Sequence, residues 1–140
     1  MSTNALKAYR QTRIKTASQG RLIVMLYDEG LKQLQSARDE LNGTHPNLET
    51  VHNAIIKAQN IITELMVSLD FEKGGDIAGN LFNLYMFFNQ TLSEANISKQ
   101  TSGIVQVYDL MTELRDAWKS IEGTNDMLDK ADVGGINLAG

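Results

Sequence analysis

The amino-acid sequence predicts an all-α fold, an antiparallel four-helix bundle with an extra short N-terminal amphipathic segment. Apolar residues recur at spacings of three and four in four separate segments, which is the period of a helix with one buried face. No segment shows sustained alternation of apolar and polar residues, so no sheet is expected. The links between the four segments are short, which favours helices that run antiparallel to their neighbours.

The chain of 140 residues suits a single domain, in which we expect three parts. Residues 1–17 form an N-terminal arm or cap segment, amphipathic and short, with Tyr9 and Ile14 among its apolar residues. Residues 18–123 form the four-helix bundle. Residues 124–140 are acidic and rich in glycine, which predicts a flexible C-terminal tail.

The first long helix is expected over residues 18–41, with Ser18 as its N-cap. The turn "NGTHPN", which contains Pro46, then leads to a second helix over about 48–69, capped by Asn47 or a neighbour. The apolar face of the first helix comprises Leu22, Ile23, Leu26, Tyr27, Leu31, Leu34 and Leu41. That of the second comprises Val51, Ile55, Ala58, Ile61 or Ile62, Leu65 and Leu69.

The stretch "DFEKGGD" interrupts the helical pattern, and Asp76 is expected to cap a third helix that ends near Asn96. A fourth helix is expected to start within 99–104 and to run to Ile121, with Gly123 as its C-terminal stop. Its apolar face comprises Ile104, Val107, Tyr108, Met111, Leu114, Trp118 and Ile121.

The third helix carries more apolar residues than one buried face requires. Its core face comprises Ile77, Leu81, Leu84, Tyr85, Phe88 and Leu92. At about 100° per residue, Phe82 and Met86 lie about 100° and 140° from Leu81, and Phe87 lies on the other flank. Either the arm or the tail packs over Phe82 and Met86, or a helix of a partner lies there. The two interpretations are compatible if the arm covers an empty groove and leaves when a partner binds.

Composition and motifs argue against an enzyme and against a cofactor or metal. The chain has no cysteine and two histidines, so Glu49-Thr50-Val51-His52 cannot be joined by the second Glu-x-x-His motif that a di-iron bundle needs. No phosphate-binding glycine motif and no nucleophile motif is present. The basic residues before Asp28 are too sparse to predict nucleic-acid binding, and the net charge is only −4.

A cytoplasmic protein without membrane insertion is expected, because the N-terminal residues lack the apolar core of a signal peptide. No apolar run approaches the roughly 18 residues that a membrane-spanning helix needs.

Four stretches, in order, resemble the flagellin export chaperones of the FliS family. They are "AYRQTRIKTASQGRLIVMLYDEGL" at 8–31, "KAQNIITELMVSLDFEKGGDIAGNLFNLY" at 57–85, "LSEAN" at 92–96 and "LMTELRDAW" at 110–118. Gln19 stands where the family often has Pro, which should loosen the start of the first helix slightly. Asp28-Glu29-Gly30 stands where the family often has Asp-Gly-Ala.

The resemblance implies a cytoplasmic helical bundle without catalytic activity that binds the disordered C-terminal segment of flagellin. Such a protein prevents premature polymerisation and delivers its client to the flagellar type III export apparatus, whose components are further candidate partners. The resemblance and the helical angles together predict six partner-binding residues, with Tyr9 as the displaceable cap: Tyr9, Ile14, Tyr27, Phe82, Tyr85 and Met86. Tyr85 has the alternative of a pure core role. The competing hypothesis is a structural or regulatory bundle that associates with itself through the same patch.

Overall fold

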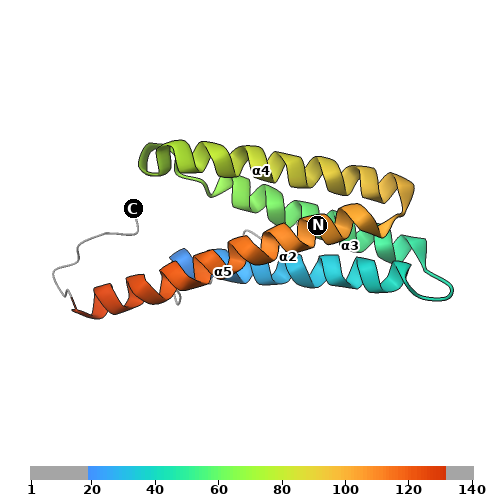
Figure 1. The fold of residues 1–140 in the computed structure, drawn as a ribbon, viewed down its shortest axis with the longest axis horizontal. Coiled ribbons are helices and arrows are strands. Elements are labelled where there is room, and N and C mark those ends of the chain that lie inside the picture. The colour runs from blue at the N-terminus through green and yellow to red at the C-terminus, as the bar shows by residue number, and fades with distance from the viewer. Residues whose placement is uncertain (1–18, 132–140) are drawn as a thin grey trace.

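The computed structural model describes residues 19–131, which form four α-helices and contain no strand. The helices are α2 (Gln19–Leu41), α3 (Leu48–Val67), α4 (Phe71–Ser98) and α5 (Thr101–Ala131). Each packs against the next in the chain, and α5 returns to pack against α2 (Figure 1). As a result α2 and α4 lie at opposite corners of the bundle. The predicted all-α bundle is confirmed.

The predicted apolar faces supply the core. Completely buried side chains come from every helix and include Tyr27, Leu34, Val51, Ile55, Ile62, Phe88, Leu92, Ile104 and Met111. Burial of one such side chain contributes about 1.5–3 kcal/mol relative to leaving it in water. Two residues that we expected on the buried faces are instead exposed, Ile77 at 69% and Ile121 at 50%. Both lie at the end of the bundle where α4 starts, and periodicity does not report where a neighbouring helix ends.

The turn between α2 and α3 is as predicted, with Asn47 as the N-cap of α3. The side-chain oxygen of Asn47 accepts a hydrogen bond from the backbone N–H of Thr50 at 3.0 Å. The backbone N–H of Asn47 donates to the Glu40 carboxylate at 2.8 Å, which ties the end of α2 to the start of α3. The predicted cap of the first helix, Ser18, lies outside the described residues.

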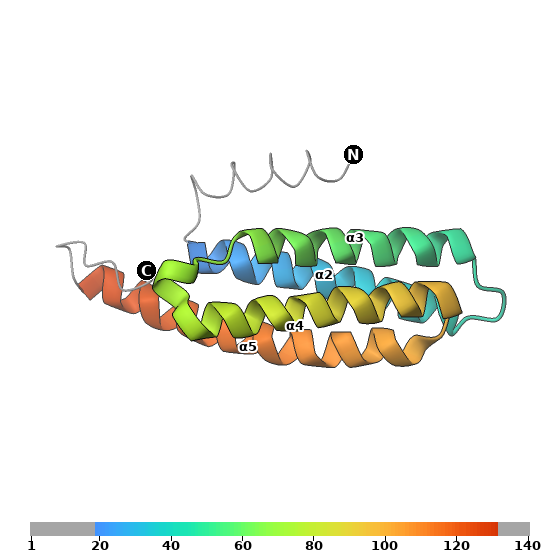
Figure 2. The same ribbon diagram turned by 90° about the horizontal axis from the view of Figure 1, so that it is seen from above.

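The expected start of the third helix at Asp76 is wrong. α4 begins at Phe71, because Asp70 is the N-cap and its carboxylate accepts from the backbone N–H of Lys73 at 3.0 Å. The glycine pair marks a kink, since Gly75 alone has non-helical angles, φ 51° and ψ −124°. Glycine adopts positive φ without a steric penalty, so one residue can change the direction of the helix without ending it. Figure 2 shows the first turn of α4 set at an angle to the rest.

The expected helix end at Gly123 is also wrong, because α5 continues to Ala131. A glycine inside a helix costs only about 1 kcal/mol relative to alanine, so it ends a helix only where the chain also turns to positive φ. The turn after α4 shows such an end without glycine: Lys99 has φ 55° and its N–H donates to the carbonyl of Ala95 at 2.7 Å. Residues 132–140, most of the expected tail, lie outside the described residues.

Candidate functional site

α4 and α5 are close together near their connection and diverge away from it. At Gly103 on α5, an added Cβ would lie 3.1 Å from the Thr91 side chain and 3.4 Å from that of Ala95, both on α4. Nine in ten real Cβ contacts are wider than this, so glycine at this position favours the close approach of the two helices. Toward the start of α4 the two helix axes separate (Figure 1). The bundle therefore opens at the end that holds the kink.

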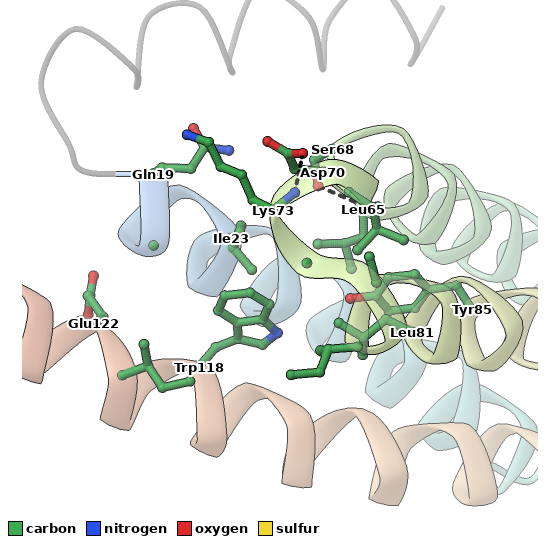
Figure 3. Close-up of a pocket in the computed structure, with 16 residues that line it drawn as sticks. Gln19, Ile23, Leu65, Ser68, Asp70, Lys73, Leu81, Tyr85, Trp118 and Glu122 are labelled. Atoms are coloured by element: carbon green, nitrogen blue, oxygen red, sulfur yellow. Dashed lines mark hydrogen bonds between the residues drawn. The ribbon is translucent and has the colours of Figure 1, made fainter. Parts of the chain in front are cut away.

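A pocket of about 650 Å³, here called the end pocket, fills this opening. Residues from all four described helices line it. Its apolar lining comprises Ile23, Leu65, Leu69, Ile77, Ala78, Leu81, Tyr85, Trp118 and Ile121. Figure 3 shows Trp118 reaching from α5 toward Ile23 of α2 and Leu81 of α4. The end pocket is thus an apolar recess that extends from the interior of the bundle to its surface.

Polar groups stand at the rim of the end pocket. Glu122 is 96% buried yet remains paired, because its carboxylate lies 3.3 Å from the Arg21 guanidinium and 3.2 Å from the Lys119 ammonium. A buried carboxylate without such partners would lose several kcal/mol of solvation. Asp70 and Lys73 line the opposite side, at the first turn of α4. The rim therefore offers both signs of charge around an apolar interior.

Two tyrosines meet at the inner end of the pocket. The hydroxyls of Tyr27 on α2 and Tyr85 on α4 are 2.5 Å apart and hydrogen-bonded, and either one can donate. Burial raises the pKa of Tyr27 far above 10, and the neighbouring Tyr85 raises it further. Burial also raises the pKa of Tyr85. Both side chains are therefore neutral, and their mutual hydrogen bond joins the two opposite corners of the bundle.

The kink places a second aromatic contact beside the pocket. The rings of Phe71 and Phe82 meet edge to face with centroids 6.0 Å apart. Because Phe71 precedes the kink and Phe82 follows it, the first turn of α4 covers part of the Phe82 ring. Phe71 itself is 53% exposed, so its ring adds to the apolar surface of the protein beside the pocket.

The structure places the predicted partner-binding residues in different environments. Tyr27 and Tyr85 are buried, and their hydroxyls are hydrogen-bonded to each other. Tyr85 also lines the end pocket, whereas Tyr27 does not. Phe82 is half-buried, whereas Met86 is 53% exposed. Tyr9 and Ile14 lie outside the described residues. The binding role of all six stays a prediction.

Sequence reasoning missed the contribution of α5 to this site. Trp118 and Ile121 were assigned to a core face by their spacing, and both line the end pocket, although Ile121 is 50% exposed. Spacing could not show that α4 diverges from them, which turns the same face into a pocket wall. Phe87, unassigned by the helical angles, is 40% exposed and its ring centroid lies 6.3 Å from that of Phe88.

The Glu49–His52 motif holds no metal-binding geometry. His52 is exposed, and its Nδ1 pairs with the Asn96 side-chain nitrogen of α4 at 2.9 Å. Among residues 19–122, whose side chains are described, no group of three or more potential ligands gathers in a way that would hold a metal ion. In the same part of the chain, none of the helices combines the length and the apolar character needed to span a membrane.

Comparison with known proteins identifies the family. The family model described as flagellar protein FliS matches residues 2–125. The chain belongs to this family. The match extends across the helices that form the end pocket, so these elements are part of the family's common domain.

Named members of the FliS family are similar to the chain over most of its length. The flagellar secretion chaperone FliSB of Pseudomonas aeruginosa is 36% identical over 121 residues, which are 84% of this chain and 94% of the relative. The flagellar secretion chaperone FliS of Salmonella typhimurium is 35% identical over 125 residues, 86% and 91% of the two chains. That of Bacillus subtilis is 33% identical over 116 residues, 83% and 84%. The FliS family consists of chaperones rather than enzymes, which confirms the expectation that the chain is not an enzyme.

Proposed function

We propose that this chain is a cytoplasmic export chaperone for flagellin. It binds the disordered C-terminal segment of flagellin, prevents premature polymerisation and delivers the subunit to the flagellar type III export apparatus. The observation that carries the proposal is the end pocket, an apolar recess of about 650 Å³ between diverging helices. The names of the relatives, which are flagellar secretion chaperones, support the same class of client.

The end pocket suits an apolar segment that becomes helical on binding. Each square ångström of apolar surface removed from water contributes about 25 cal/mol, and part of this gain offsets the entropy lost when the segment is ordered. Ile77 and Ile121 are 69% and 50% exposed at the mouth, so a bound segment would bury them. The charged rim at Asp70 and Lys73 gives the segment polar contacts where it leaves the pocket.

The arm, residues 1–17, acts as the displaceable cover of this site. Gln19 lines the end pocket, so the segment that precedes it is attached at the pocket's edge. Tyr9 and Ile14 are the candidate side chains that occupy the pocket in the free protein. Because cover and client compete, removal of the arm should increase client affinity.

Calorimetry and tryptophan fluorescence test the proposal together. The chain has a single tryptophan, Trp118, and it lines the end pocket, so a bound client should shift its emission. Titration with a peptide of the flagellin C-terminal segment should show tight binding with a negative heat-capacity change. Absence of both heat and an emission change would refute the proposed function.

A matched pair of variants locates the binding site. Ile77→Glu places a charge at the pocket mouth and should weaken peptide binding at least tenfold, because the carboxylate would lose its water on binding. Leu48→Glu introduces the same charge at the first residue of α3, where the side chain is 50% exposed and lies outside the pocket lining. Equal affinities of the two variants would place the client elsewhere.

The alternative function is a bundle that associates with itself through the exposed apolar residues of α4. The observation that favours it is the exposure of Met86 and Phe87, at 53% and 40%. Size-exclusion chromatography with light scattering at two protein concentrations separates the two functions. A concentration-dependent dimer that the flagellin peptide does not dissociate supports the alternative.

A further inference from the structure

The tyrosine pair at the inner end of the end pocket has a third member. Burial raises the pKa of Tyr27, whereas a side-chain hydrogen bond with Trp118 lowers it. An indole N–H donates and does not accept, so the Tyr27 oxygen is the acceptor of this bond. The same hydroxyl lies 2.5 Å from that of Tyr85. A chain of hydrogen bonds therefore runs from Trp118 of α5 through Tyr27 of α2 to Tyr85 of α4.

Burial decides which tyrosine donates to the other. Tyr27 is completely buried and does not line the end pocket. Within the described residues, Trp118 and Tyr85 are the side chains that pair with its hydroxyl. If Tyr85 donated to Tyr27, the Tyr27 proton would stay in the interior without an acceptor, which is costly. If Tyr27 donates to Tyr85, the Tyr27 hydroxyl is paired as acceptor and as donor, and the Tyr85 proton is the one that remains.

The Tyr85 hydroxyl is placed to meet an occupant of the end pocket. Tyr85 lines the pocket, and Figure 3 shows its oxygen on the side toward Trp118. Two other polar side chains of the lining are already paired: the Ser68 hydroxyl donates to the Leu65 carbonyl at 2.8 Å, and Glu122 forms two ion pairs. For the Tyr85 proton, the described part of the chain supplies no acceptor once Tyr27 donates.

The surroundings of the Tyr85 hydroxyl select the chemistry of its acceptor. The lining beside it includes the apolar side chains of Ile23, Leu65, Ala78 and Leu81. A carboxylate brought here would lose more solvation than one hydrogen bond from a neutral hydroxyl restores. A purely apolar group would leave the proton unpaired. A carbonyl oxygen is neutral and accepts the bond, so it fits both conditions.

We propose that the Tyr85 hydroxyl determines specificity in the end pocket by donating a hydrogen bond to a carbonyl oxygen of the client. This carbonyl belongs to an Asn or Gln side chain, or to the last turn of a client helix, where carbonyls lack partners within the helix. The inference rests on the proposed function and deepens it, because it names a polar group that the client carries besides its apolar side chains. Segments that are equally apolar but place no carbonyl here bind more weakly.

Deletion of single hydroxyl groups tests the inference. Tyr85→Phe keeps the ring and should weaken binding of the flagellin C-terminal peptide about fivefold or more by calorimetry, because the client carbonyl would be buried without a donor. Tyr108→Phe removes the same atom from a residue of α5 outside the pocket lining and should change affinity less than about twofold. Circular dichroism should show unchanged helicity for both. Wild-type affinity of Tyr85→Phe would overturn the inference, because water rather than the client would then pair with the hydroxyl.

Tyr27→Phe separates a direct contact from an effect on the fold. This variant and Tyr85→Phe should lower stability to a similar extent, because each leaves one buried donor without its acceptor. Tyr27→Phe leaves the Tyr85 proton for the client, so it should weaken peptide binding less than Tyr85→Phe does. Equal losses of affinity would show that the chain of hydrogen bonds acts through the fold, and the inference would be overturned.

Nuclear magnetic resonance of the wild-type chain covers the case in which a variant fails to fold. With carbon-13 at the tyrosine Cζ atoms, saturation with peptide should move the Tyr85 signal and slow the exchange of its hydroxyl proton with water. The Tyr108 signal, from outside the pocket lining, should stay in place. If Trp118 emission reports binding while the Tyr85 signal and exchange rate are unchanged, the inference is overturned.

Peptide variants identify the source of the carbonyl. Replacing the residue that supplies the acceptor should abolish the difference in affinity between the wild-type chain and Tyr85→Phe, as in a double-mutant cycle. If replacement of an Asn or Gln does so, the acceptor is that side chain; if the difference persists in every such peptide, it is a backbone carbonyl. If replacement of an Asp or Glu does so, the acceptor is a carboxylate and the inference is overturned.

The outcomes also separate this inference from the proposed function. If Ile77→Glu weakens binding while Tyr85→Phe binds as the wild type does, the inference is overturned and the proposed function stands. If the wild-type chain binds no peptide, both fail.

Discussion

α2 and α4 occupy opposite corners of the bundle, but their outer surfaces differ. Among residues 19–122, whose side chains are described, nine large apolar side chains are exposed; five of them lie on α4 and none on α2. The five are Phe71, Ile77, Met86, Phe87 and Ile97. Ion pairs join α2 to α5, from Asp28 to Arg115 at 2.7 Å and from Arg21 to Glu122 at 3.3 Å. Outside the end pocket, the surface of α2 thus carries ion pairs with α5, whereas α4 carries exposed apolar side chains.

The difference explains why α4 is apolar around most of its circumference. A helix in a four-helix bundle buries one face, so apolar side chains on both flanks exceed what the core needs. Exposed patches of this kind on a monomer usually mark interaction sites. Ile77 borders the end pocket, whereas Met86 and Phe87 lie outside its lining.

The largest expected effect on the free energy of unfolding comes from the buried face of α4, compared with its exposed face. Phe88 is completely buried, so Phe88→Ala should lower the free energy of unfolding by about 3–5 kcal/mol. Its neighbour Phe87 is 40% exposed, and Phe87→Ala should cost less than about 1.5 kcal/mol. Urea denaturation of both variants measures this. Similar losses would mean that Phe87 belongs to the core and that the division of α4 is incorrect.

The sequence was sufficient to predict which face of each helix is buried and where α3 begins. Asn47 is a local signal, because its cap bonds lie within a few residues. The start of α4 was not predictable in the same way, since Asp70 and Asp76 both precede helical residues and only the structure shows that the Asp70 carboxylate caps the helix.

The candidate sites depend on relations between helices that periodicity does not contain. Periodicity gives no register between α3 and α4, which is visible only in the hydrogen bonds from Gln59 to Ser93 and from Asn89 to Thr63. Likewise Trp118 lies on a predicted face, and the divergence of α4 from α5 makes that face a pocket.

The tyrosine pair offers the next largest effect and tests the link between the two corners. Burial raises the pKa of both Tyr27 and Tyr85 above 10, the ordinary value that applies in the unfolded chain. Their stability contribution is therefore complete below pH 10 and is lost as the pH rises above it. At pH 11 the wild type should have lost roughly 1.5–3 kcal/mol more than the Tyr27→Phe/Tyr85→Phe double variant, the lower figure being the contribution of Tyr27 alone.

The measurement is urea denaturation of both proteins between pH 9 and pH 11. Ionisation of other groups affects both chains alike, so the difference between them reports the pair. Replacing both hydroxyls at once leaves no unpaired partner between them, so the double variant should be folded. Parallel pH profiles would show that the two hydroxyls are accessible to solvent and do not join the corners as a buried pair.

A smaller effect is expected at the kink that opens α4 toward the end pocket. Gly75 has φ 51° and ψ −124°, a conformation that costs other residues about 1–3 kcal/mol. Gly75→Ala should lower stability by that amount. Gly79 is helical, and an added Cβ there meets nothing within 4 Å, so Gly79→Ala should raise stability by about 0.5–1 kcal/mol. Thermal melts of the two variants should shift in opposite directions; a stabilising Gly75→Ala would contradict the kink.

The smallest effect concerns the ion pair that holds α2 against α5. The Arg115 guanidinium contacts both carboxylate oxygens of Asp28, at 2.7 and 3.4 Å, and this hydrogen bonding raises the pKa of Arg115. The side chains are 30% and 49% exposed, so water and salt screen the pair. Arg115→Gln should therefore cost at most about 1 kcal/mol, and less at 1 M salt. Because the pair lies outside the lining of the end pocket, the variant should bind the flagellin peptide as the wild type does. A tenfold loss of affinity would show that the client also contacts the outer α2–α5 surface.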